Sequence, residues 1–197
     1  MRRTGLQMIS SSTGDPIPLE DLKLHLRLEF GYTDEDEYLM NLQRAAVAEV
    51  EDMTNYKIGK QVWKVTYDAW SSDAHMDIPI GPLTSMPSSG ITYKLSTGNS
   101  TQFGSTIWNY STQEHMPRVT LDYGESWPSD TLHPNDPISF EVKVGTTSLP
   151  PRLKQAVMML VSHWYENREP YIVGQTVMAV QDAVTKLVNN YRIWDFG

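Results

Sequence analysis

Residues 149–170 read LPPRLKQAVMMLVSHWYENREP and join two prolines, an amphipathic helix and an aromatic, charged ending. Pro150 and Pro151 suit the opening turn of a helix, where a missing N–H costs nothing. Ser148 stands just before them and is the expected helix cap. The apolar residues that follow recur at helical spacing: Leu153, Ala156, Val157, Leu160, Val161 and Trp164. This pattern predicts a central packing helix.

The apolar face of this helix is broader than one packing partner requires. Met158 and Met159 widen it, which predicts burial by the protein's own fold and by a neighbouring subunit. The charged residues beyond it are expected to form salt links within or between subunits. The predicted subunit-interface residues are Met158, Met159, Tyr165, Glu166, Arg168 and Glu169.

A last helix is expected after Gly174. Its apolar residues are Val177, Val180, Val184, Leu187 and Tyr191. Residues 192–197 then read RIWDFG, and an apolar, aromatic ending of this kind is expected to dock onto the protein's own core or onto a partner.

Two helices are predicted near the N-terminus. Residues 1–15 contain a polar run without periodicity and are expected to form a flexible arm or an edge segment. Residues 19–28 show helical spacing behind Pro18, with Gly31 as a stop. Thr33 is then the expected cap of a helix of about five turns, whose apolar line is Leu39, Leu42, Ala46, Val50 and Met53.

Between residues 57 and 147 the period changes to the alternation of β-strands. Strands are expected around residues 62–68 and at 76–80, 91–95, 106–110, 118–122 and 138–144, separated by Gly- and Pro-rich turns. The predicted fold is α+β. A four-helix antiparallel bundle formed by residues 16–56 and 148–192 carries an inserted small antiparallel β domain at 57–147, followed by a tail at 193–197.

Composition limits the possible functions. With 16 basic and 24 acidic residues the net charge is −8, which disfavours direct capture of nucleic acid, because that affinity comes from Lys and Arg at phosphates. The chain has no cysteine, and neither a membrane span nor a secretory signal is expected.

Catalytic and metal-binding patterns are weak. The acidic run at residues 34–37 could be a divalent-metal site, but an acidic first helical turn is what the helix dipole favours. His163 and Glu166 share a helix face, yet a single pair cannot complete a coordination sphere. Large aromatic residues could stack sugars or bases, although core or subunit contacts are favoured; they are Trp70, Trp108, Tyr110 and Trp127. We predict no enzyme activity, no metal and no cofactor.

The order of these segments resembles the phage head-tail connector, or adaptor, family, in which a helical bundle carries an inserted β domain. The resemblance is carried by LEDLKLHLR at residues 19–27, by AA at 45–46 followed by VEDMTN at 50–55, and by LPPRLKQA at 149–156 running into HWYENRE at 163–169. Tyr191 and Arg192 complete the set.

The resemblance implies a structural virion protein, made in the host cytoplasm, that forms a ring of usually twelve copies beneath the portal vertex. Its implied partners are the portal protein and a downstream neck or tail-completion protein, with genomic DNA passing through the lumen without specific binding. The expected portal-interface residues are Tyr191, Arg192, Ile193, Trp194 and Phe196. The alternatives are another phage neck or tail-completion component, a carbohydrate-binding β module and an unrecognised hydrolase.

Overall fold

A computed structural model describes residues 4–12, 14–29, 31–86, 90–112, 117–168 and 176–193, with only the backbone described at 4 and 176–179. The chain divides into two compact units. A β unit contains residues 4–12, 59–146 and 193, and a helical unit contains 14–58 and 147–192. The chain passes from the helical unit to the β unit after residue 58 and returns after residue 146. The boundaries predicted from the sequence, near 56 and 148, are close to these two points.

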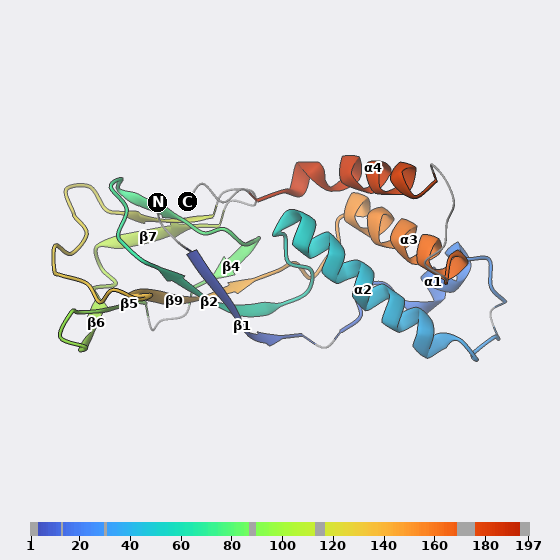
Figure 1. The fold of residues 1–197 in the computed structure, drawn as a ribbon, viewed down its shortest axis with the longest axis horizontal. Coiled ribbons are helices and arrows are strands. Elements are labelled where there is room, and N and C mark those ends of the chain that lie inside the picture. Colours follow the sequence, from blue (N-terminus) through green and yellow to red (C-terminus); the bar gives the residue numbers. More distant parts are fainter. Residues whose placement is uncertain are drawn as a thin grey trace. The chain divides into compact units, whose positions relative to one another are not determined.

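The helical unit contains α1 (Leu19–His25), α2 (Asp36–Thr54), α3 (Pro151–Glu166), α4 (Thr176–Val188) and the short 3-10 helix η1 (Asn189–Tyr191). Helix α3 packs against both α2 and α4, and Figure 1 shows it beside each of them. Ile17 and Leu22, from the N-terminal segment of the unit, join the same core.

Helix α2 follows the predicted apolar line. Leu39, Ala46 and Val50 are fully buried, and Leu42 and Met53 are partly buried against the core. Asn55 ends the helix in the left-handed conformation, with φ +56°. Asparagine is one of the few residues other than glycine that adopt this conformation at low cost.

Both predicted hydroxyl caps were wrong. Helix α2 has Glu35, not Thr33, at its N-cap position, and α3 has Pro150, not Ser148; neither makes a side-chain cap hydrogen bond. In α3 the proline fixes the backbone that leads into the helix, so a hydroxyl cap is not needed to set its start.

Helix α3 is the central packing helix of its unit. Its buried residues are Leu153, Ala156, Val157, Met158, Leu160 and Val161. Trp164 is partly buried and packs on the same core. The broad apolar face predicted from the sequence therefore lies largely inside the unit.

The β unit contains nine strands within its described residues. They are β1 (Thr4–Ser11), β2 (Gln61–Tyr67), β3 (His75–Asp77), β4 (Leu83–Ser85), β5 (Ile91–Lys94), β6 (Ser100–Phe103), β7 (Trp108–Ser111), β8 (Arg118–Leu121) and β9 (Ile138–Val144). One sheet has the order β1-β2-β9-β5-β6, with β4 also paired to β9, and a second has the order β3-β8-β7. The strand pairs are antiparallel.

The α+β class and the antiparallel sheets are confirmed, with several differences in detail. Of the two expected alternatives for the N-terminal residues, the edge segment is the one observed, since Thr4–Ser11 form the edge strand β1. Strands β4 and β6 were not predicted. Predicted strands at 76–80 and 106–110 are displaced, since β3 spans His75–Asp77 and β7 begins at Trp108.

The two sheets share one hydrophobic core. Val65, Phe140 and Ile91 from the larger sheet cluster with Val119 and Leu121 from the smaller one. Strand β9 lies in the middle of the larger sheet and alternates buried with half-exposed or exposed residues along its whole length, as a strand with one face on the core should.

Candidate functional site

The C-terminal half of α3 carries three of the predicted interface residues, Met159, Tyr165 and Glu166. On one side it meets the N-terminal end of α2 through a cluster of polar and aromatic side chains. On another it lines a pocket together with α2 and α4. Both features lie within the helical unit.

Glu35 is the centre of the first feature, which we call the Glu35 cluster: Glu35, Tyr38, Tyr165 and Arg168. The Tyr165 hydroxyl donates to Oε2 of Glu35, and Arg168 Nη2 donates to Oε1, each at 2.5 Å. The Arg168 guanidinium carbon lies 4.7 Å from the centre of the Tyr38 ring and 5.1 Å from that of Tyr165. One cation therefore contacts a carboxylate and two aromatic faces.

These contacts shift the ionisation of the groups involved. The hydrogen bond from Arg168, followed by that from Tyr165, lowers the pKa of Glu35 below its ordinary value of 4.5. The hydrogen bond to Glu35 raises the pKa of Tyr165, which therefore stays protonated and able to donate. The Glu35 cluster is therefore a set of charge-assisted hydrogen bonds that joins the start of α2 to the end of α3. It is not an acid-base pair poised for catalysis.

The predicted subunit-interface residues occupy different environments. Tyr165 and Arg168 are engaged within their own chain by Glu35. Met158 is only 9% exposed, because it packs in the core of its own unit; its assignment to a subunit interface stays a prediction. Met159 is partly buried against that core, Glu166 is exposed, and Glu169 lies outside the described residues.

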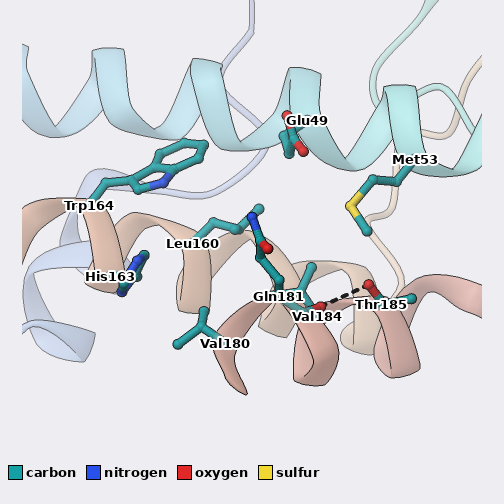
Figure 2. Close-up of a pocket in the computed structure, with 9 residues that line it drawn as sticks. All are labelled: Glu49, Met53, Leu160, His163, Trp164, Val180, Gln181, Val184 and Thr185. Atoms are coloured by element: carbon teal, nitrogen blue, oxygen red, sulfur yellow. Dashed lines mark hydrogen bonds between the residues drawn. The ribbon is translucent and has the colours of Figure 1, made fainter. Parts of the chain in front are cut away.

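The pocket between α2, α3 and α4 has a volume of about 270 Å³. Figure 2 shows its lining side chains, which are Glu49, Met53, Leu160, His163, Trp164, Val180, Gln181, Val184 and Thr185. The Thr185 hydroxyl donates to the backbone oxygen of Gln181 at 2.8 Å, so it is already engaged within α4. The lining mixes apolar with polar groups.

The predicted portal-interface residues lie at the end of the helical unit and beyond it. Tyr191 packs edge-on against Tyr56, with ring centres 5.5 Å apart, and Arg192 is exposed. Ile193 is only 2% exposed and belongs to the β unit, where its Cδ1 atom closely approaches Gly81. Its side chain is thus buried in the single chain, and its expected role at the portal interface stays a prediction. Trp194 and Phe196 lie outside the described residues.

The large aromatic residues of the β unit are mostly packing groups. Trp70 and Trp127 stack with ring centres 5.1 Å apart and planes 10° apart, and Trp108 is 8% exposed. Trp127 also donates from its indole nitrogen to the backbone oxygen of Asp73. Tyr110 is different, because it is 40% exposed on β7.

Within the described residues, no group of three or more His, Cys, Asp or Glu side chains is placed to hold a metal ion. In the acidic run at 34–37, Glu35 binds Arg168 and Asp36 pairs with Lys23 at 2.5 Å. None of the helices in the described part of the chain has the length and apolarity needed to cross a bilayer.

Sequence reasoning missed two parts of this site. Glu35 was treated as part of a helix start and Tyr38 was not singled out, whereas both contact Arg168, which lies at least 130 positions later in the chain. Gln181 and Thr185 were not singled out, because a polar residue on an amphipathic helix gives no sign that it borders a pocket.

Comparisons with known proteins agree with this architecture. Residues 128–192, which include β9, α3, α4 and η1, match the family model described as phage gp6-like head-tail connector protein. The match contains the α3 run on which the resemblance to connectors was based, and that resemblance is confirmed. No curated protein matches the chain.

Solved structures of a gene transfer agent (GTA) particle have a similar fold. A chain from the neck of the empty particle, computed with C6 symmetry, aligns with a TM-score of 0.76 at 23% identity, covering 98% of this chain and 97% of that one. Chains from the native virion and from the native neck computed with C12 symmetry give TM-scores of 0.74 and 0.73 at 22% and 20% identity, with the same coverage.

Proposed function

We propose that this protein is a structural head-tail connector, located in the neck of a phage-like particle between the capsid and the tail. The observation that carries the proposal is the connector-family match over residues 128–192. The similarity of fold to neck chains over 98% of the sequence supports it. A structural role also fits the Glu35 cluster, because its hydrogen bonds hold α2 and α3 together.

The proposed assembly is a closed ring of twelve subunits. Neck structures with a similar fold were computed with C6 and C12 symmetry, and repeated heterologous contacts close a ring when the rotation is right. In this proposal the four helices form an antiparallel bundle. The portal protein lies on one side of the ring and a downstream neck or tail-completion protein on the other.

We further propose that DNA passes through the ring without specific binding. Each subunit carries a net charge of −8, and an acidic or neutral lumen repels phosphates instead of holding them. The protein has no proposed enzymatic activity. Lysines and arginines lining the channel of an assembled ring would contradict this part of the proposal.

The proposed portal contact uses Tyr191, Arg192, Trp194 and Phe196, since aromatic and arginine side chains dominate the energies of many interfaces. Removing everything after Arg192 would also remove buried Ile193 and so disturb the β unit. The sharper test is Trp194→Ala with Phe196→Ala, which retains Ile193. This variant should bind the portal protein more weakly than the unchanged protein does. The matched control is Tyr123→Ala, at a fully exposed aromatic residue of the β unit.

The experiment that tests the function is deletion of the gene from its phage or particle locus, followed by cryo-electron microscopy of the products. A connector predicts DNA-filled heads without tails, and density for the protein at the neck of complete particles. Pull-down with the portal protein separates this proposal from its alternative, another neck or tail-completion component. Normal tailed particles in the deletion strain would contradict both.

A further inference from the structure

Strand β1 is uncharged, as strands that pair with a neighbour along both edges usually are. In the described fold it has a neighbouring strand along one edge only. It spans eight residues, Thr4–Ser11, and none of them is charged. It pairs with β2 on one side and ends the sheet on the other. Edge strands are normally shortened, charged or bulged to prevent further pairing. Here the one register shift lies between Met8 and Ser10, so Thr4–Met8 remain regular.

The side chains of β1 leave part of the core-facing surface uncovered. Leu6 and Met8 lie opposite Val65 and Trp63 of β2. Directly opposed residues of an antiparallel pair project from the same face, and Val65 is fully buried in the core. Leu6 and Met8 are nevertheless 40% and 52% exposed, and Ile9 is 50% exposed. At this edge, the core-facing side of the sheet therefore carries hydrophobic side chains that the rest of the subunit does not bury.

The opposite edge of the same sheet is formed by β6 (Figure 1). Its sequence, Ser100–Phe103, is also uncharged, and Ser100 and Thr101 are exposed. The register continues across the sheet, from Thr4 through Tyr67, Ile138 and Tyr93 to Thr101. Since every neighbouring pair on the five-strand path is antiparallel, β1 and β6 run in the same direction.

A ring needs two different surfaces on each subunit. Pairing β1 with β1 of another copy would be isologous and would close a dimer, whereas a ring of more than two subunits needs heterologous contacts. Two uncharged edges at opposite ends of one sheet satisfy that requirement. Strand addition at such edges provides main-chain hydrogen bonds, with alternate side chains adding specificity.

We propose that β1 of each subunit pairs, in parallel, with β6 of the neighbouring copy, so that the larger sheets join around the ring. This inference rests on the proposed ring-forming function. The neighbouring copy would also cover Leu6, Met8 and Ile9, whose exposure the single subunit leaves unexplained.

The geometry gives a direct test by cross-linking. Within one subunit β1 and β6 are separated by four inter-strand spacings of about 4.8 Å, or about 19 Å in all, too far for a disulfide or a short bismaleimide reagent. The chain has no cysteine, so introduced thiols are the only reactive ones. Gln7 and Ser100 are exposed and lie on the outer face of the sheet, opposite Lys64 and Lys94.

The experiment uses the full chain carrying Gln7→Cys with Ser100→Cys, assembled into rings alone or on its portal protein. We expect a ladder of cross-linked oligomers, and none from either single variant. A cross-linked dimer from Gln7→Cys alone would mean that β1 pairs with β1. Rings without cross-links from this double variant, and from Gln7→Cys with Gln102→Cys at the next outward-facing position of β6, would show that the two strands are not neighbours. Either result overturns the proposal.

A second set of variants tests the strand without cysteines. Leu6→Lys with Met8→Lys places charge on the β1 edge and should reduce ring formation at least tenfold, while circular dichroism and the melting temperature of the monomer stay near those of the unchanged protein. Tyr110→Lys, at a side chain as exposed as Leu6 but on β7, is the control and should assemble normally. Unimpaired rings from the Leu6/Met8 variant overturn the strand pairing and leave the connector function standing. Failure of the unchanged protein to form rings, even on the portal, contradicts the connector function itself.

Discussion

Glu35 shows why single residues were the hardest part of this protein to predict. In the sequence it belongs to an acidic run at a helix start, where the dipole favours carboxylates. In the structure its two oxygens accept hydrogen bonds from Tyr165 and Arg168, about 130 positions later in the chain. Sequence spacing cannot reveal such a partner, because the pairing depends on how α2 and α3 cross.

The ion pair at Glu35 gives a pH-dependent prediction. A lowered pKa means that Glu35 stabilises the fold above its unfolded value near 4.5, and that this contribution is lost as the pH falls through the lower folded value. Arg168→Met should therefore raise the Glu35 pKa, measured by carboxylate NMR titration. It should lower the melting temperature at pH 7 but not at a pH below the folded pKa.

Glu166→Gln, at an exposed position of the same helix end, is the control for this titration and should leave the Glu35 pKa unchanged. An unshifted Glu35 pKa in Arg168→Met would show that Arg168 does not hold this carboxylate in solution.

Gln43 is a second residue whose role is visible only in the structure. It is fully buried on α2, and its Oε1 accepts a hydrogen bond of 2.8 Å from the backbone N–H of Ile17. Gln43→Ala should cost about 1–3 kcal/mol for the unsatisfied buried N–H, with a further loss from the cavity. Urea denaturation measures this, with Asn41→Ala at an exposed position of the same helix as the control. A loss below about 0.5 kcal/mol would contradict the role of Gln43 as the acceptor.

At the scale of elements, helices were predicted better than strands. The lines through Leu39, Ala46 and Val50 and through Leu153, Val157 and Leu160 have the period of a helix, and all six residues are buried. Strand β1 was obscured by its serine-rich continuation, and β6 by the Ser/Thr-rich sequence around it. Three- and four-residue strands such as β4 and β6 are too short to show alternation and are defined by their pairing partners instead.

Helix α3 gives a prediction on packing. Leu153 is completely buried. Leu153→Ala should therefore lower the free energy of unfolding by about 2–5 kcal/mol. Gln155→Ala, at an exposed position of the same helix, should change it by less than about 0.5 kcal/mol. Denaturant titration of both variants compares them, and equal stabilities would mean that α3 is not the packing centre of its unit.

At the scale of the whole molecule, the distribution of charge gives a prediction about DNA. A chain with a net charge of −8 should not retard double-stranded DNA in a gel shift at about 50 mM salt, where a protein making several phosphate contacts binds well. Assembled rings should behave in the same way as the monomer. A gel shift that disappears steeply as the salt concentration rises would contradict this prediction, because it would show that the protein has a local cationic surface despite its negative net charge.

The two units are interleaved along the chain, and this affects the order in which they can be completed during synthesis. The β unit takes its edge strand β1 from the first described residues, its middle strand β9 from residues 138–144, and buried Ile193 from beyond α4. The helical unit must likewise wait for α3 and α4, although α1 and α2 are made early. Domains encoded in one continuous stretch can fold in turn as they leave the ribosome. Neither unit of this protein can, because each is built from segments that lie far apart in the sequence, and a chain that ends before residue 193 lacks the buried Ile193 of the β unit.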